Sequence, residues 1–170
     1  MPETDPSTIP EPIVVATSCP AQTKQVAAEL AAQLRDGDLL VLAGDLGAGK
    51  TCFTQGLGAG LGIEGRITSP TFTLANQYEG RLELHHLDVY RIDDIGETLD
   101  LDLPELLERG VTVIEWGEQI EPVLPADRLT VRLLLGADDD DRELRFEPGS
   151  AAWRQRLGAL AAIADRLEPC

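Results

Sequence analysis

The pattern of apolar and polar residues along the chain predicts strands where residues are apolar throughout or alternate, and helices where apolar residues recur at helical spacing. Residues 39–43 are apolar throughout, which is typical of a strand buried on both faces. Residues 111–116 form a second buried strand, and a short strand is predicted at 13–16. Between residues 73 and 90 the sequence pattern repeats every two residues on either side of a turn at 79–80, which predicts an antiparallel hairpin.

The remaining chain is predicted to form a second hairpin and four helices. The second hairpin is the strand pair in which residues 129–135 meet Leu144 and Phe146 around the aspartates at 138–141. The predicted helices are one capped by Ser18 and running to Gly37, one beginning near Lys50, an acidic one over 93–108 and an amphipathic one over 151–167.

The alternation of strands and helices predicts an α/β fold. The expected sheet is mixed, with parallel strands at its centre, antiparallel hairpin strands beside them and helices on both faces, as in a three-layer sandwich. A chain of 170 residues suits one domain. We place this domain at 13–170, after a proline-rich tail at 1–12 that is expected to be flexible.

The charge balance disfavours several kinds of partner. Thirty acidic residues against 14 Lys and Arg give a net charge of −16, which opposes direct binding to RNA, DNA or an anionic membrane surface. No apolar run approaches the roughly 18 residues that span a bilayer. The first dozen residues lack the pattern of a signal peptide, so a cytoplasmic location is expected.

The three cysteines are Cys19, Cys52 and Cys170, and they stand far apart in the sequence. Zinc sites and disulfide frameworks are recognised by pairs or clusters at short, matched spacings. All three cysteines are therefore predicted to be free thiols in a reducing compartment.

The segment 44–51, GDLGAGKT, matches the phosphate-binding loop pattern G-x-x-x-x-G-K-[ST] between a buried strand and a helix. Glycines let the backbone N–H groups point at a phosphate, and the helix N-terminus adds its positive dipole end. Lys50 is expected to reach the β- and γ-phosphates, Thr51 Oγ1 to bind Mg²⁺, and the Cys52 N–H to lie near the α-phosphate. Lys50 is one of only two lysines in the chain, which favours a specific role.

A P-loop site also needs an acid at the tip of a neighbouring strand to hold Mg²⁺. Asp88 and Glu115 each end a predicted strand, and the residues alone leave the choice between them open. His85 and His86 point to opposite faces of a strand, which favours hydrogen-bonded structural roles over metal binding. No Asn-Lys-x-Asp sequence follows the loop, so ATP is preferred to GTP.

Four motifs in order, GDLGAGKT (44–51), SPTFT (69–73), HLDVYR (86–91) and EWGE (115–118), closely resemble the bacterial TsaE family. Members of this family are P-loop ATPases required for threonylcarbamoyladenosine formation on tRNA, and the resemblance spans roughly residues 13–148. It implies ATP binding by the residues of the loop and of the first helical turn: Asp45, Leu46, Gly47, Ala48, Gly49, Lys50, Thr51 and Cys52.

The resemblance also implies roles outside the loop. Thr51 and Glu115 match the magnesium-binding positions, and Asp88 matches the essential acid of the H-x-D-x-Y-R motif, also near the metal. Trp116, which the residues alone place in the core, would lie close to the nucleotide. Arg142 occupies about the place of a nucleotide-contacting arginine. Cys52 stands where many members have a second threonine, and a backbone contact would survive that change.

The implied activity is slow, Mg²⁺-dependent ATP hydrolysis within an assembly with TsaB and TsaD, the latter transferring threonylcarbamoyl to tRNA; this chain would meet tRNA only through the complex. Lys50 would stabilise phosphoryl charge while Asp88 or Glu115 orients metal or water. Arg91 is the nearest candidate for an arginine finger, so a partner is expected to complete the site. The alternatives are a small-metabolite kinase and a nucleotide-gated binding module whose surface is the acidic stretch 93–108.

Overall fold

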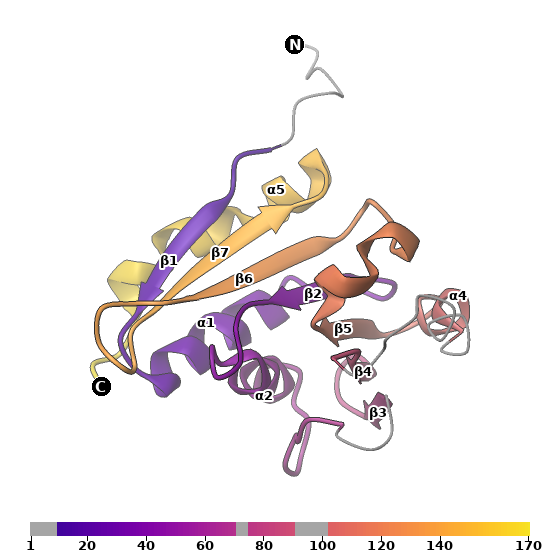
Figure 1. The fold of residues 1–170 in the computed structure, drawn as a ribbon, viewed down its shortest axis with the longest axis horizontal. Helices are drawn as coiled ribbons and strands as arrows, with labels where there is room; N and C mark the ends of the chain where they lie inside the picture. Colours follow the sequence, from indigo (N-terminus) through magenta and orange to yellow (C-terminus); the bar gives the residue numbers. More distant parts are fainter. Residues whose placement is uncertain (1–9, 71–74, 91–101) are drawn as a thin grey trace.

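The computed structural model describes residues 10–70, 75–90 and 102–170, and its strands form one seven-stranded sheet (Figure 1). The strands lie in the order β1-β7-β6-β2-β5-β4-β3. Strands β6, β2, β5 and β4 are parallel, whereas the pairs β1–β7, β7–β6 and β3–β4 are antiparallel. The strands are β1 (Ile13–Thr17), β2 (Leu39–Ala43), β3 (Ala75–Tyr78), β4 (Leu84–Asp88), β5 (Val111–Glu115), β6 (Leu129–Leu135) and β7 (Arg142–Pro148).

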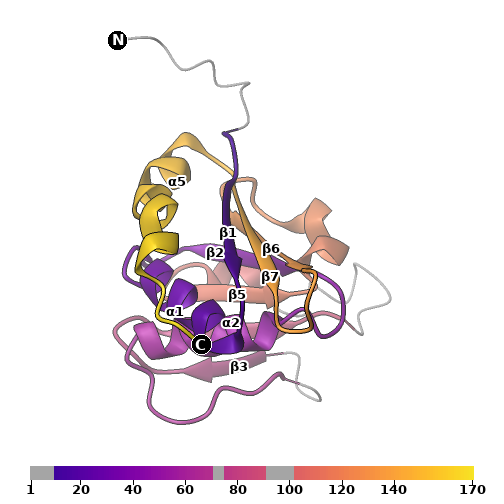
Figure 2. The same ribbon diagram turned by 90° about the vertical axis from the view of Figure 1, so that its left-hand side faces the viewer.

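Helices cover both faces of the sheet, as Figure 2 shows. One face carries α1, α2, α5 and η3, and the other carries α4 and η2. The helices are α1 (Pro20–Ala31), α2 (Lys50–Gly60), α4 (Leu103–Leu106), η2 (Gly117–Val123), α5 (Ala151–Arg156) and η3 (Leu157–Arg166). The mixed α/β fold and both predicted hairpins are thereby confirmed.

Strand β2 shows why this arrangement forms. All five of its residues are buried; Leu40 and Leu42 pack into the larger apolar cluster, and Leu39 and Val41 into the smaller one on the opposite face. An unbroken apolar run gives each face of the central strand its own core. The carboxyl end of β2, where the glycine-rich loop begins, is therefore anchored from both sides.

Several predicted helix boundaries were wrong. The first helix ends at Ala31 instead of Gly37, because the N–H groups of Gln33 and Leu34 bond to carbonyls three residues back and tighten the chain into a turn. Its N-terminal cap residue is Cys19, not Ser18. The last predicted helix divides into α5 and the 3₁₀ helix η3.

Some predictions fall on residues outside the described part of the chain. Most of the tail, part of SPTFT, and Arg91 with most of the acidic segment 93–108 belong to this group. Within the described end of that segment, the helix is the single turn α4. No helix in the described ranges is long and apolar enough to cross a membrane.

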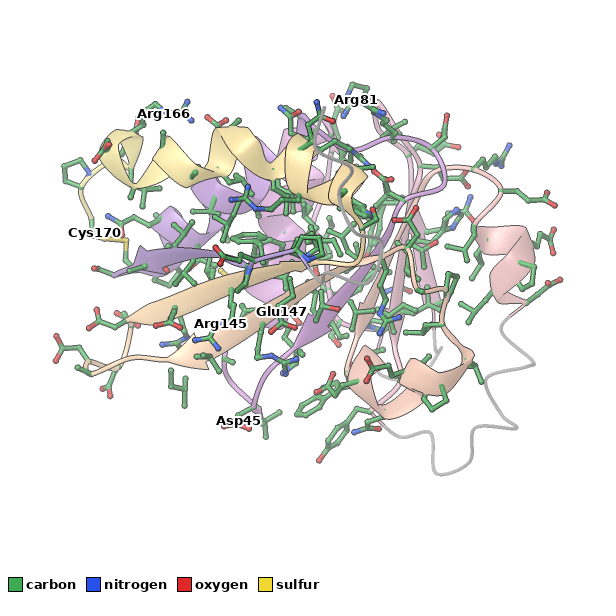
Figure 3. The ribbon with its side chains drawn as sticks, turned by 90° about the horizontal axis from the view of Figure 1, so that it is seen from above. Asp45, Arg81, Arg145, Glu147, Arg166 and Cys170 are labelled. Carbon is green, nitrogen blue, oxygen red and sulfur yellow. A yellow bond between two sulfur atoms is a disulfide. The ribbon has the colours of Figure 1, made fainter. Side chains whose placement is uncertain are left out.

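The prediction of three free thiols was wrong for two of them. Cys19 and Cys170, separated by 151 positions, form a disulfide that joins the C-terminus, labelled at Cys170 in Figure 3, to the residue before α1. The segment after η3 runs back along α1, where Gln22 Nε2 donates to Glu168 O and the Glu168 N–H donates to Gln25 Oε1. Spacing along the sequence could not reveal this proximity, because it arises from packing. Cys52 is free, as predicted.

Candidate nucleotide site

The glycine-rich loop joins the end of β2 to the first turn of α2. Gly47 and Gly49 have φ of 82° and 105°, in the left-handed region that favours glycine. A side chain on Gly44 would place its Cβ 2.6 Å from the Leu133 carbonyl oxygen. The loop thus needs these glycines to curl against β6. Asp45 and Leu46 are exposed, and since neither a carboxylate nor an alkyl side chain can donate to a phosphate, only their backbone N–H groups could do so.

Lys50 lies beneath this loop and is only 5% exposed. Its Nζ donates to the carbonyl oxygens of Gly44 at 2.7 Å and Asp45 at 2.9 Å. The same nitrogen lies 3.8 Å from the centre of the Trp116 ring, a cation–π contact. Burial lowers the pKa of Lys50, while nearby carboxylates, that of Glu115 foremost, act in the opposite direction. The loop therefore holds a cation close to where a phosphate would lie.

Thr51 and Glu115 come together at the carboxyl edge of the sheet. Thr51 Oγ1 donates to Glu115 Oε1 at 2.9 Å. The other carboxylate oxygen, Oε2, lies 2.7 Å from His86 Nε2. Glu115 and His86 are 2% and 0% exposed. Three side chains from α2, β5 and β4 thus form one chain of hydrogen bonds.

Asp88 is beside Glu115 but has different partners. The two are register neighbours on the parallel strands β4 and β5. Asp88 Oδ2 accepts from Ser69 Oγ at 3.0 Å, and Oδ1 accepts from the Tyr90 N–H at 2.9 Å. Asp88 is therefore tied to the segment that begins the SPTFT motif, and Glu115 to the helix that follows the loop.

Trp116 lies beside the loop instead of deep in the core. It follows β5 with φ of 62°, a left-handed conformation that turns the chain out of the strand. Its ring covers Lys50 on one side and meets the Tyr90 ring, whose centre is 4.8 Å away. Tyr90 is 53% exposed. The aromatic pair thus borders the loop lysine.

Arg142 contacts the loop through two of its three guanidinium nitrogens and the β6–β7 turn through the third. Nε donates to Ala48 O at 2.8 Å and Nη2 to Gly47 O at 3.2 Å. Nη1 donates to the carbonyls of Asp139 and Asp141, both at 2.7 Å, in the turn between β6 and β7. Arg142 therefore joins the acidic turn to the glycine-rich loop.

Cys52 lies in the first turn of α2 and faces α1. Its Sγ is 3.7 Å from the Pro20 carbonyl oxygen. Burial raises the pKa of the Cys52 thiol, although the charges of Lys24 and Arg142 act against this. The side chain is thus a half-buried thiol directed at a neighbouring helix.

The donor groups around the loop fit a magnesium nucleotide. Thr51 and Glu115 offer oxygen atoms, which Mg²⁺ prefers, and a magnesium ion in such sites takes its remaining ligands from phosphates and water. No cluster of three or more His, Cys, Asp or Glu within 10–70, 75–90 and 102–170 could hold a metal by itself. The arrangement suits a metal that arrives with a nucleotide.

His86 is a site residue that the sequence reasoning left in a structural role. Its Nε2 contacts Glu115 directly, and it stands two positions before Asp88 on β4. Because side chains at i and i+2 on a strand share a face, a histidine at this spacing was the signal that could have indicated it. His85 points to the other face, as predicted, and its Nε2 lies 3.2 Å from Arg109 O.

The fold and this loop define a P-loop protein: a parallel-centred sheet with a glycine-rich strand-to-helix turn, a buried lysine and a strand-end carboxylate beside the following threonine. The family model described as "Threonylcarbamoyl adenosine biosynthesis protein TsaE" matches residues 17–144. The chain belongs to the TsaE family, as the four motifs indicated.

Curated relatives and a solved structure agree with this family. The tRNA threonylcarbamoyladenosine biosynthesis protein TsaE of Bacillus subtilis is 47% identical over 128 residues, which cover 75% of this chain and 80% of the relative. The protein of that name from Treponema pallidum is 49% identical over 106 residues, 62% of this chain and 78% of the relative. The crystal structure of B. subtilis YdiB matches with a TM-score of 0.79 and 36% identity, covering 91% of this chain and 97% of that one.

Proposed function

We propose that this protein is a Mg²⁺-dependent ATPase that acts with TsaB and TsaD in forming threonylcarbamoyladenosine on tRNA. The observation that carries the proposal is the contact between Thr51 Oγ1 and Glu115 Oε1, 2.9 Å apart beside the glycine-rich loop and its lysine. The names of the curated relatives support the pathway, with tRNA as the modified molecule, and a cytoplasmic place of action is part of the proposal.

Thr51 and Glu115 would hold the magnesium ion of Mg-ATP. When bound, the ion neutralises charge on the β- and γ-phosphates. Glu115 suits this task because it is buried and hydrogen-bonded at both carboxylate oxygens, which fixes its position. Lys50 would exchange the Gly44 and Asp45 carbonyls for phosphate oxygens, and the backbone N–H groups of 45–52 would surround the phosphates.

Asp88 would serve hydrolysis more than binding. Its carboxylate accepts hydrogen bonds from the Ser69 hydroxyl and the Tyr90 backbone N–H. It therefore contacts the segment that begins the SPTFT motif instead of Thr51. A carboxylate so placed suits the orientation of the attacking water or of a water bound to the metal. The two neighbouring acids would thus divide metal binding and water orientation.

The partners would supply what this chain does not. Arg142 donates to four backbone carbonyls, so its guanidinium is committed to holding the loop in this structure. Because the arginine that contacts the loop is committed in this way, and Arg91 lies outside the described residues, we expect turnover of the single chain to be slow. The net charge of −16 opposes a polyanion, so tRNA would be reached through the TsaB–TsaD complex.

The first experiment tests nucleotide binding. Lys50→Ala should abolish tight ATP binding and leave the fold intact, because Lys50 contacts loop carbonyls and a ring instead of the apolar core. Unchanged ATP affinity would overturn the P-loop assignment. Hydrolysis is measured alone and with TsaB and TsaD; fast turnover by the single chain would count against partner dependence.

The second experiment separates the two carboxylates. ATP is titrated at several Mg²⁺ concentrations, and hydrolysis is measured with partners present. Glu115→Ala should weaken the Mg²⁺ dependence of binding, whereas Asp88→Ala should bind Mg-ATP but lose turnover and tRNA modification. The opposite pattern would show that the roles are reversed. If the Asp88 variant still supports tRNA modification, ATP would act as a switch that gates a binding surface. Transfer of phosphate to an added metabolite would indicate a kinase.

A further inference from the structure

His86 has no role in the proposed chemistry, yet it is fully buried against the carboxylate at the centre of the site. Its relative exposure is 0%, and its Nε2 lies 2.7 Å from Glu115 Oε2. Glu115 can only accept at this oxygen when ionised, so we assign the imidazole hydrogen to Nε2. Nδ1 has no hydrogen-bond partner in the described part of the chain. Among the described residues, the hydrogen bond of the ring is therefore the one to Glu115.

We propose that His86 is a positioning residue that sets the orientation of the Glu115 carboxylate toward Thr51 and the metal. The inference rests on the proposed binding of a magnesium nucleotide. The final torsion of a glutamate side chain is broad, so the carboxylate plane is not fixed by the side chain itself. A donor on Oε2 restricts this rotation and keeps Oε1 toward Thr51 Oγ1, 2.9 Å away. The metal oxygen is then in place before the nucleotide arrives.

The strand register explains why this position can do so. On β4 and β5, His86 pairs with Val113 and Asp88 pairs with Glu115, so the histidine lies one pleat behind the two acids. From there its ring reaches forward to Glu115, while Asp88 remains bonded to Ser69. Hydrogen-bonding partners of metal-binding carboxylates typically change metal affinity by about 10–100-fold when removed.

The chain offers a matched control in the adjacent residue. His85 is also buried, at 6% exposure, and its Nε2 also lies within hydrogen-bonding distance of an oxygen, the Arg109 carbonyl at 3.2 Å. It lies on the opposite face of β4 and has no contact with Glu115 among its described hydrogen bonds. His85→Gln thus changes the same residue type on the same strand outside the site.

The test measures metal affinity apart from turnover. Binding of Mn²⁺ to the full chain is followed by electron paramagnetic resonance in the presence of ADP, and ADP affinity is measured in EDTA. His86→Leu should lower Mn²⁺ affinity by about 10–100-fold and leave ADP affinity in EDTA unchanged. His86→Gln, whose amide nitrogen can replace Nε2, should stay within about threefold of the wild type, as should His85→Gln.

A second pair of variants decides the matter if His86→Leu does not fold. Asparagine places its amide nitrogen nearer to the Nδ1 position, so His86→Asn should lose Mn²⁺ affinity where His86→Gln keeps it. Long-range nitrogen NMR of the wild type should show the hydrogen on Nε2.

Each contrary outcome has one meaning. Wild-type Mn²⁺ affinity in His86→Leu, or in His86→Asn if that pair is used, would overturn the inference, as would a hydrogen on Nδ1 instead of Nε2. Equal losses of ADP binding with metal and in EDTA would indicate a merely structural histidine and overturn it too. If the wild type itself binds ADP with no contribution from metal, the proposed function fails, and this inference fails with it.

Discussion

Arg142 provides a prediction whose size can be worked from its contacts. The side chain joins the turn between β6 and β7 to the glycine-rich loop, with two donors on the Ala48 and Gly47 carbonyls and one nitrogen shared by two carbonyls of the turn. In this geometry it acts as a clamp on the loop. Arg142→Ala should therefore weaken nucleotide binding by allowing the loop to leave its phosphate-binding shape.

The magnitude follows from the two bonds to the loop. Hydrogen bonds from a charged donor contribute about 1.5–3 kcal/mol each, and the low end applies because Arg142 is half-buried and Gly47 is exposed. Water replaces part of what is lost, so about 1.5–3 kcal/mol is expected for the pair. If the loop must be in shape to bind, this energy appears as a fall in affinity of about 10–150-fold.

A lysine variant separates the clamp from a direct charge contact with the nucleotide. Arg142→Lys keeps the charge but cannot donate to two loop carbonyls in a fork, so the clamp predicts nearly the same loss as Arg142→Ala. Arg132→Ala is the control, because Arg132 pairs with Glu147 on β7. Equilibrium binding of a fluorescent ADP analogue gives the affinities. Full affinity in Arg142→Lys with a loss in Arg142→Ala would show that Arg142 contacts phosphate; no loss in either would refute the clamp.

Three further predictions concern the cysteines, the helix packing and tRNA. In denaturant, alkylation should modify Cys52 alone when no reductant is present and all three cysteines after reduction. On the native protein, Cys52 should be alkylated more slowly than an ordinary thiol, and the rate should rise at higher pH, because burial raises the pKa of this thiol. Gly56→Ala should cost about 1–3 kcal/mol in chemical denaturation, since its Cβ would lie 2.6 Å from the Lys24 carbonyl oxygen, whereas Gly158→Ala meets nothing within 4 Å and should not destabilise. In filter binding, bare tRNA should bind the single chain poorly at physiological salt; submicromolar, salt-sensitive binding would contradict the charge argument.

The parts of the fold that could be predicted are those whose causes are local. The buried β2 and the loop at 44–51 follow from a contiguous apolar run and from glycines at fixed offsets before Lys50. The hairpin of β3 and β4 follows from two-residue periodicity. The end of α1 could not be predicted in this way, because Leu34 is buried and continues the apolar spacing beyond the last helical residue.

The remaining features depend on contacts between distant segments. The disulfide of Cys19 with Cys170 exists because the segment after η3 returns along α1. The contact of Arg142 with the loop needs the β6–β7 turn to lie beside the end of β2, which follows from the strand order. Neither contact can be inferred from the spacing of residues along the sequence, since both result from the order of the strands and the packing of the helices on the sheet.

Asp88 and Glu115, between which the sequence leaves the choice of metal ligand open, differ in their hydrogen-bond partners. Both acids end parallel neighbours and are paired in register, so their side chains leave the sheet on the same side. Thr51 donates to Glu115, and Asp88 instead accepts from Ser69. A movement of the segment that carries Ser69 would therefore change the surroundings of Asp88 and leave the bonds of Glu115 to Thr51 and His86 in place. This separation of contacts is the physical basis for proposing that one acid holds the metal while its neighbour responds to the adjoining segment.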